Sequence, residues 1–256
     1  MGVGLRSPRP KGYEAYGLCD AGTGGGVSEA EFEDQAGELV ERIELLDGEE
    51  RIAAACRGSA NPAALQWIAD TLSISSEHTV ADLGAGLGGP AGWLRQQAGC
   101  DVIASDPSWP AVDGARRLFG LRAIQATADA SPFGDDSCEG VLLLGVLSVV
   151  DDRCSVVDEA RRIGRSIAVL DYCATSRDEL SVGGSRFPSV DVLAAELAAA
   201  WTGIQVARVD DPIPESWQRA AERVQAGVPK PQTEREVIDA IESGRLAPHA
   251  LVARRS

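Results

Sequence analysis

Short runs of apolar residues alternate along this chain with segments in which apolar residues recur every three or four positions. The runs predict strands buried on both faces, and the recurring positions predict amphipathic helices between them. The predicted strands are 79–83, 102–105, 121–126, 141–146, 167–171, 204–209 and 249–253. The predicted helices in the same region are 90–98, 109–119, 152–163, 189–200, 215–225 and 233–243. This alternation is typical of an α/β protein with a parallel sheet covered on both sides.

The N-terminal part of the chain follows a different pattern. Residues 1–27 are rich in glycine and lack apolar periodicity, which predicts a flexible arm. Ser28 and Glu31 form a capping-box pair at the start of a predicted helix, and two further helices follow before residue 75. The sequence therefore predicts a helical cap over 28–75. We expect a core over 76–256, interrupted by lid insertions at 172–188 and 212–246.

Composition excludes several classes of function. The chain has 24 Lys+Arg against 39 Asp+Glu, a formal net charge of −15, which argues against binding to nucleic acid or to an anionic membrane surface. It contains no apolar run of about 18 residues and begins without the apolar stretch of a signal peptide, so we expect a cytoplasmic protein. Six scattered cysteines and two histidines lack metal-ligand spacing, so no metal site is expected.

The strongest chemical signal is a glycine-rich loop between the first predicted strand of the core and the next helix. Gly84, Gly86 and Gly88 would let the backbone approach a ligand closely, and the next strand ends at Asp106, where an acid can accept hydrogen bonds from ribose hydroxyls. Together these features predict an adenosine-containing cofactor. The spacing also fits a dinucleotide loop. However, Asp82 would repel a pyrophosphate, and Pro90 removes a helix N–H that a phosphate could use.

Several further segments match sequence motifs of one family in the same order along the chain. The stretch 80–89, Asp106, the stretch 128–133 (ADASPF), the stretch 135–147 and the stretch 187–190 (FPSV) resemble motifs of class I S-adenosylmethionine (SAM)-dependent methyltransferases that act on small molecules. The resemblance covers the chain from about residue 60 to its end and leaves residues 1–50 uncovered. It implies a Rossmann-like doubly wound sheet of about seven strands, with the last strand antiparallel and an N-terminal helical cap.

The resemblance also implies the cofactor, SAM, and the residues that hold it. In the family, the acid that matches Asp129 contacts the adenine amino group. One departure concerns the stretch after the fourth strand, where many relatives have two histidines and this chain has Ser148 and Val149. The candidate cofactor residues are Asp82, Gly84, Ala85, Gly86, Gly88, Asp106, Pro107, Asp129, Ala130, Leu144 and Gly145.

Methyl transfer from a sulfonium needs mainly the positioning of the acceptor, so the absence of a nucleophilic triad does not contradict it. Candidates for an optional general base are Asp171 and Tyr172, at the end of the fifth strand, and His249. Tyr13 and Tyr16 would line the acceptor pocket if the arm folds over the cofactor. We expect a monomer or homodimer acting on a small molecule, with O-, N- or C-methylation left open. Two alternatives also stay open: an NAD(P)-dependent oxidoreductase, and a SAM-binding protein of this fold that catalyses another reaction or binds a partner.

Overall fold

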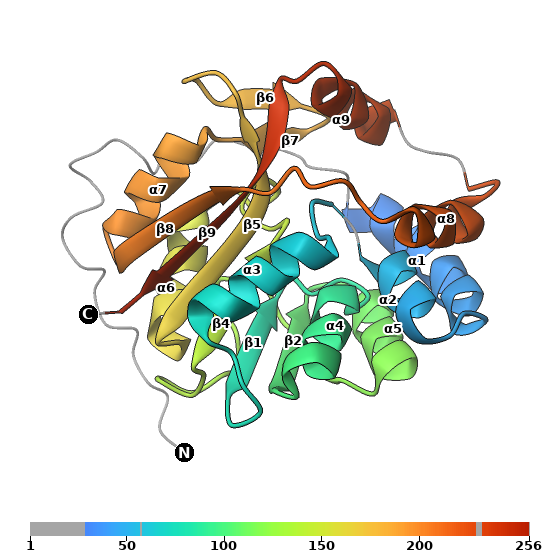
Figure 1. Cartoon of the computed structure of the whole chain (residues 1–256), viewed down its shortest axis with the longest axis horizontal. Helices are drawn as coiled ribbons and strands as arrows, with labels where there is room; N and C mark the ends of the chain where they lie inside the picture. The colour runs from blue at the N-terminus through green and yellow to red at the C-terminus, as the bar shows by residue number, and fades with distance from the viewer. Residues whose placement is uncertain (1–28, 57, 229–231, 256) are drawn as a thin grey trace.

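The computed structural model describes residues 29–56, 58–228 and 232–255, so the predicted arm 1–27 and Ser28 lie outside it. A seven-stranded sheet forms the centre of the molecule (Figure 1). Its order is β3 (Arg122–Gln125), β2 (Asp101–Asp106), β1 (Thr79–Leu83), β4 (Gly140–Leu144), β5 (Ser166–Ala174), β9 (Leu246–Arg254) and β8 (Thr202–Arg208). The strands from β3 to β5 are parallel to their neighbours, whereas β9 pairs antiparallel with both β5 and β8. The predicted fold class is confirmed, including the antiparallel last strand.

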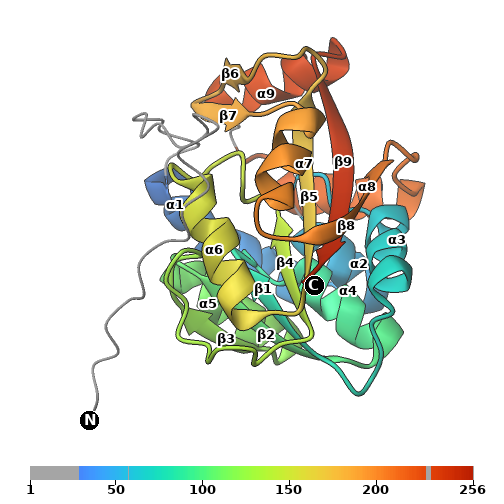
Figure 2. The ribbon, with the colours of Figure 1, turned by 90° about the vertical axis from the view of Figure 1, so that its left-hand side faces the viewer.

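Helices cover both faces of this sheet, as Figure 2 shows. One layer contains α3 (Pro62–Leu72), α4 (Gly89–Ala98) and α5 (Trp109–Phe119), and the opposite layer contains α6 (Arg153–Ile163) and α7 (Val190–Ala198). The side chains of each strand alternate between the two layers: Val80 and Leu142 pack with the first, and Ala81 and Leu143 pack with the second. The continuous apolar runs of the sequence follow from this two-sided burial.

The N-terminal helices lie on the α4–α5 side of the sheet. They are α1 (Glu29–Glu44), which packs on α5, and α2 (Gly48–Ala55), which packs on α4 and on α8 (Glu215–Gln225). The start of α3 agrees with its sequence signal, because the side chain of Asn61 accepts the Ala64 N–H at 3.0 Å and Pro62 is the first helical residue.

The insertion 212–246 contains the two helices that the sequence predicts, whereas the insertion 172–188 contains a hairpin that it does not predict. Within 172–188 a hairpin forms from β6 (Leu180–Val182) and β7 (Ser185–Phe187), joined by Gly183 and Gly184, which both have positive φ. The strands of this hairpin are too short to give a clear alternation. The insertion 212–246 divides in two: α8 packs on the N-terminal helices, and α9 (Gln232–Glu242) packs on β6 and β9 (Figure 1).

Several predicted boundaries shift in the structure. β4 ends two residues earlier than predicted, at Leu144, because the chain turns at Gly145, which has a φ of 75°. β5 and β9 are longer than predicted, since they pair with each other over nine residues each. No helix within the described part of the chain is both long and apolar enough to cross a membrane.

Candidate functional site

The glycine loop between β1 and α4 is the centre of the candidate site. Gly84 has a φ of 73°, and a Cβ there would lie 2.7 Å from Cγ2 of Val146, so the loop packs directly against the segment after β4. The N–H groups of Gly84 and Ala85 donate to the carbonyl of Ser105 at 2.8 and 2.9 Å, which ties the loop to the end of β2. The candidates from β1, β2 and β4 therefore meet at one edge of the sheet, where ligands bind in open α/β folds.

Asp106 connects the glycine loop to the turn that follows β2. Its Oδ2 accepts the Gly86 N–H at 2.8 Å, and its Oδ1 accepts the Ser108 N–H at 2.9 Å. Gln125, at the end of β3, donates to the carbonyl of Pro107 at 2.8 Å. The predicted ribose acid thus also fixes the backbone that surrounds it. A carboxylate oxygen can accept more than one hydrogen bond.

Asp82 is a buried acid without a partner among the described residues. It lies on β1 below the glycine loop, is 1% exposed, and neither carboxylate oxygen receives a hydrogen bond. Burial, with a smaller contribution from the charge of Asp106, raises its pKa from 3.8 to about 7. An unpaired buried carboxylate is costly, so this position fits a ligand that brings a cationic group.

The end of α2 forms a wall beside the same loop. A Cβ at Gly89 would lie 2.5 Å from the carbonyl carbon of Ala55 and from the backbone nitrogen of Cys56, so helix α4 starts in direct contact with this wall. Burial and the charge of Asp82 raise the pKa of the Cys56 thiol. This contribution of the N-terminal helices could not be read from the sequence, because no motif links residues 55–56 to the glycine loop.

Asp171 lies on β5, the strand beside β4, and it receives hydrogen bonds from the segment after β4. The Ser148 N–H donates to its Oδ2 at 3.0 Å, the Ser148 hydroxyl to its Oδ1 at 2.8 Å, and the Tyr172 N–H to its Oδ1 at 2.9 Å. Asp171 is 2% exposed; burial raises its pKa to about 6, although the hydrogen bonds from Ser148 and Tyr172 lower it. The structure therefore adds Ser148, which the sequence identified only as a departure from the family motif.

The other candidates for catalysis occupy different surroundings. Tyr172 is half-buried against the apolar cluster of the β6–β7 hairpin, which includes Phe187, and burial raises its pKa. His249 lies opposite Asp171 in the β5–β9 pairing, and its Nδ1 is 3.1 Å from the Ala247 carbonyl. Because a carbonyl only accepts, Nδ1 is the donor in this contact. Tyr13 and Tyr16 lie outside the described residues.

The remaining cofactor candidates follow β3 and β4. Asp129 and Ala130 are exposed on the loop after β3, and this loop is bonded to α6 through Ser131. Leu144 ends β4, and the Gly145 N–H donates to the Leu170 carbonyl at 2.7 Å, which holds this turn against β5. Within the described residues, no group of three or more His, Cys, Asp or Glu side chains could hold a metal ion.

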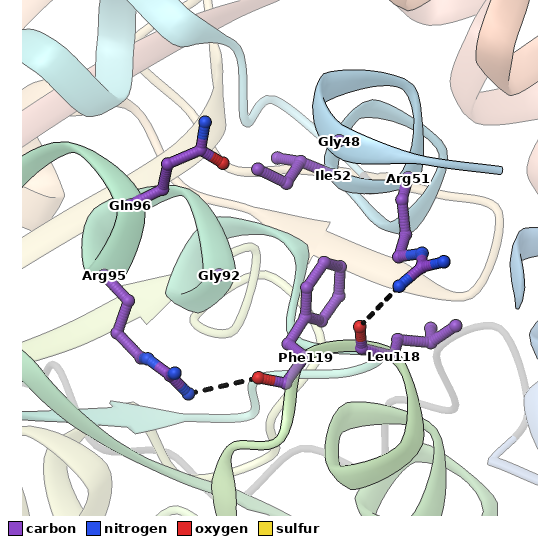
Figure 3. Close-up of a pocket in the computed structure, with 8 residues that line it drawn as sticks. All are labelled: Gly48, Arg51, Ile52, Gly92, Arg95, Gln96, Leu118 and Phe119. Atoms are coloured by element: carbon purple, nitrogen blue, oxygen red, sulfur yellow. Dashed lines mark hydrogen bonds between the residues drawn. The ribbon is translucent and has the colours of Figure 1, made fainter.

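A separate pocket of about 340 Å³ lies between α2, α4 and α5 and contains none of the candidate cofactor residues (Figure 3). Its two arginines point at the end of α5: Arg51 donates to the Leu118 carbonyl at 3.4 Å, and Arg95 donates to the Phe119 carbonyl at 3.1 Å. The Arg51 guanidinium therefore joins the N-terminal helices to the core, whereas the Arg95 guanidinium joins α4 to the end of α5.

Comparisons with known proteins find methyltransferases among the similar sequences and folds. Residues 81–170 match the family described as "Methyltransferase domain". The chain is 32% identical over 112 residues to Methyltransferase GfsG of Streptomyces halstedii, and the match spans 40% of each chain, so this chain covers less than half of that relative. The comparisons do not favour the oxidoreductase alternative.

Solved structures show the same fold. Geranyl diphosphate C-methyltransferase of Streptomyces coelicolor A3(2), solved with S-adenosyl-L-homocysteine, has a TM-score of 0.61 at 15% identity, with 76% of each chain covered. The [4+2]-cyclase SpnF has a TM-score of 0.69 at 14% identity, with 90% of this chain and 97% of that chain covered. Together with the match of residues 81–170 to the methyltransferase domain family, these structures show that the chain has the fold of these proteins and that part of its sequence is similar to methyltransferases.

Proposed function

We propose that this protein transfers the methyl group of SAM to a small-molecule acceptor by in-line displacement. The observation that carries the proposal is Asp82, a buried and unpaired carboxylate directly below the glycine loop. SAM carries an ammonium group and a sulfonium, and it supplies an activated methyl group. The protein then has to bind the cofactor, hold the acceptor in line and exclude water. Holding the two reactants in line can by itself lower the barrier to methyl transfer by roughly 7–11 kcal/mol.

Each candidate cofactor residue has a distinct role in this proposal. Asp82 attracts the cationic end of the cofactor, and the loop from Gly84 to Gly88 leaves space for the cofactor beside the backbone. Asp106 accepts from the ribose hydroxyls, and it also accepts the Gly86 and Ser108 N–H groups that fix the surrounding backbone. Asp129 accepts from the adenine amino group. The first and last of these acids thus bind opposite ends of one ligand.

Ser148 and Asp171 form the pair that we assign to proton transfer when the acceptor is a hydroxyl. The acceptor proton moves to the Ser148 oxygen while the Ser148 proton moves to Asp171, and the methyl group bonds to the acceptor oxygen as SAM becomes S-adenosylhomocysteine. With a pKa of about 6, Asp171 is ionised at neutral pH and can take that proton. His249 and Tyr172 remain candidates for contacts with the acceptor.

The first test is binding. We expect titration calorimetry to show binding of SAM and S-adenosylhomocysteine but not of NAD. Affinity should fall at least tenfold in the Asp82→Asn and Asp129→Ala variants, since each change removes a charged partner of the ligand. Asp211→Asn, which changes an exposed acid outside the site, should bind as the wild type does. Absence of SAM binding, or unchanged affinity in both site variants, would contradict the proposal.

The second test is turnover with radiolabelled SAM and a panel of hydroxyl, amine and activated-carbon acceptors. Label in at least one acceptor is the expected result, and the labelled atom decides between O-, N- and C-methylation. Tight binding of SAM without transfer to any acceptor would favour the alternative in which this fold hosts another reaction. A [4+2]-cyclase has the same fold, so this fold can host a reaction other than methyl transfer.

A monomeric or homodimeric state and a cytoplasmic location remain predictions.

A further inference from the structure

A buried glutamate on α6 is bonded to the loop that carries Asp129. Glu159 is 9% exposed, and its Oε1 accepts from the Ser131 N–H at 2.9 Å and from the Ser131 hydroxyl at 2.6 Å. Ser131 is two residues after Asp129, whose own side chain is exposed. The backbone of this loop therefore sets where Asp129 lies, and Glu159 holds that backbone.

Arg162, one turn further along α6, completes the attachment. Its guanidinium donates to both carboxylate oxygens of Glu159, at 2.8 and 2.7 Å, and to Oδ1 of Asp135 at 2.6 Å. The carbonyl of Arg162 also accepts the Asp136 N–H at 3.0 Å. The loop 127–137 is thus bonded to α6 at two places, near the middle of the loop at Ser131 and near the end of the loop at Asp135 and Asp136.

The chemistry of these contacts requires a carboxylate. Burial would raise the pKa of Glu159, but the hydrogen bonds from Arg162 and Ser131 outweigh it and keep the pKa below its usual value. An ionised carboxylate only accepts, so Glu159 can take the two Ser131 donors and the guanidinium together. A buried acid that serves only packing would be replaceable by an apolar side chain, whereas this one specifies a loop conformation.

We propose that Glu159 is a positioning residue for the recognition of adenine: through Ser131 it holds the loop 127–137 so that Asp129 reaches the adenine amino group. The inference rests on the proposed function, because it takes SAM as the ligand. Glu159 does not touch the cofactor in this proposal. It determines how well the site distinguishes an amino group from an oxygen at that position of the base.

The experiment compares S-adenosylhomocysteine with S-inosylhomocysteine by titration calorimetry. The inosyl ligand has an oxygen in place of the amino group and carries a proton on the adjacent N1. We expect the wild type to prefer the adenosyl ligand by at least about tenfold, which is the effect of one hydrogen bond to a charged group. Glu159→Ala should lower the affinity for the adenosyl ligand about tenfold and leave the affinity for the inosyl ligand nearly unchanged. The ratio of the two affinities should then be close to one, as is also expected for Asp129→Ala. Glu159→Gln keeps an acceptor oxygen for Ser131 and should retain an intermediate ratio.

Glu139→Ala is the matched control. Glu139 also accepts a backbone N–H, from Thr79 at 3.0 Å, and lies 3.7 Å from Arg165, but it stands at the opposite end of the sheet. It should keep the wild-type ratio. If Glu159→Ala does not fold, Ser131→Ala replaces it, since this variant loses only the hydroxyl bond and should lower the ratio about threefold.

Three results would overturn the inference. The first is an unchanged ratio of the two affinities in Glu159→Ala, or in Ser131→Ala when it replaces that variant. The second is an equal loss of affinity for both ligands in the variant. The third is a wild type that binds the two ligands equally. Each of these leaves the proposed function intact as long as S-adenosylhomocysteine binds. A wild type that binds neither ligand would instead refute the proposed function, and the role of Glu159 would fall with it.

Discussion

Replacing Asp82 with asparagine removes the charge that the free protein holds below the glycine loop. The carboxylate is 1% exposed and has no hydrogen-bond donor among the described residues, and burial together with Asp106 raises its pKa to about 7. The folded protein therefore binds a proton at this site over a range of pH in which the unfolded chain has released it. Asparagine cannot ionise, so the variant lacks this effect.

The sign and size follow from the two pKa values. Because the folded-state pKa is raised, stability falls as the pH rises from about 4 through about 7. At ~1.4 kcal/mol for each pH unit between the two values, the loss reaches roughly 1.5 kcal/mol at pH 5 and roughly 4 kcal/mol at pH 8. The stability of Asp82→Asn relative to the wild type should therefore rise by about 2.5 kcal/mol between these pH values, or about 5–10 °C in Tm.

The assay is urea unfolding without cofactor at pH 5, 6.5 and 8, with Asp211→Asn as the exposed control. A second series adds S-adenosylhomocysteine at about 100 times its Kd, which should stabilise the wild type by about 2.7 kcal/mol and the variant much less at the same concentration. Parallel pH curves for wild type and variant would refute the reasoning, since they would mean that Asp82 finds a donor in the folded protein.

Two further predictions concern the packing of α2 against the glycine loop and the role of Asp171 in proton transfer. Gly89→Ala places a Cβ 2.5 Å from the backbone where α2 ends and should destabilise the protein by about 1–3 kcal/mol in urea unfolding. Gly37→Ala, in α1 with no atom within 4 Å of the new Cβ, should instead stabilise by up to ~1 kcal/mol, and equal effects of the two would contradict this packing. Ser148→Ala removes both the proton relay and a hydroxyl donor to Asp171, so kcat/KM for methyl transfer should fall. Because the pKa of Asp171 should rise above about 6, the acid limb of the remaining activity should move to higher pH. An unmoved limb would exclude Asp171 as the proton acceptor.

The cofactor side of the site could be predicted from the sequence because its requirements are local. The glycine loop needs positive φ and close backbone approach at fixed positions, and Asp106 follows at the end of the next strand, so residue types and spacing suffice. The sheet could also be predicted, since strands buried on both faces leave continuous apolar runs.

Other features around the candidate site depend on contacts between distant parts of the chain. Ser148 and Asp171 are 23 positions apart, and Ser131 and Glu159 are 28 apart, so neither pair gives a pattern along the sequence. The hairpin β6–β7 has strands of three residues each, which is too short for periodicity to detect. Tertiary contacts rather than local propensity decide these features.

The N-terminal helices are best regarded as part of the cofactor site rather than as a separate unit. Trp217 on α8 donates to Glu49 on α2 at 2.9 Å, and Arg42 on α1 donates to the carbonyl of Val224 at 2.9 Å. The other end of α2 meets the glycine loop at Gly89. Helix α2 therefore contacts α8 at one end and the start of α4 beside the glycine loop at the other. The insertion that contains α8, between β8 and β9, thus packs on the same helix that borders the glycine loop.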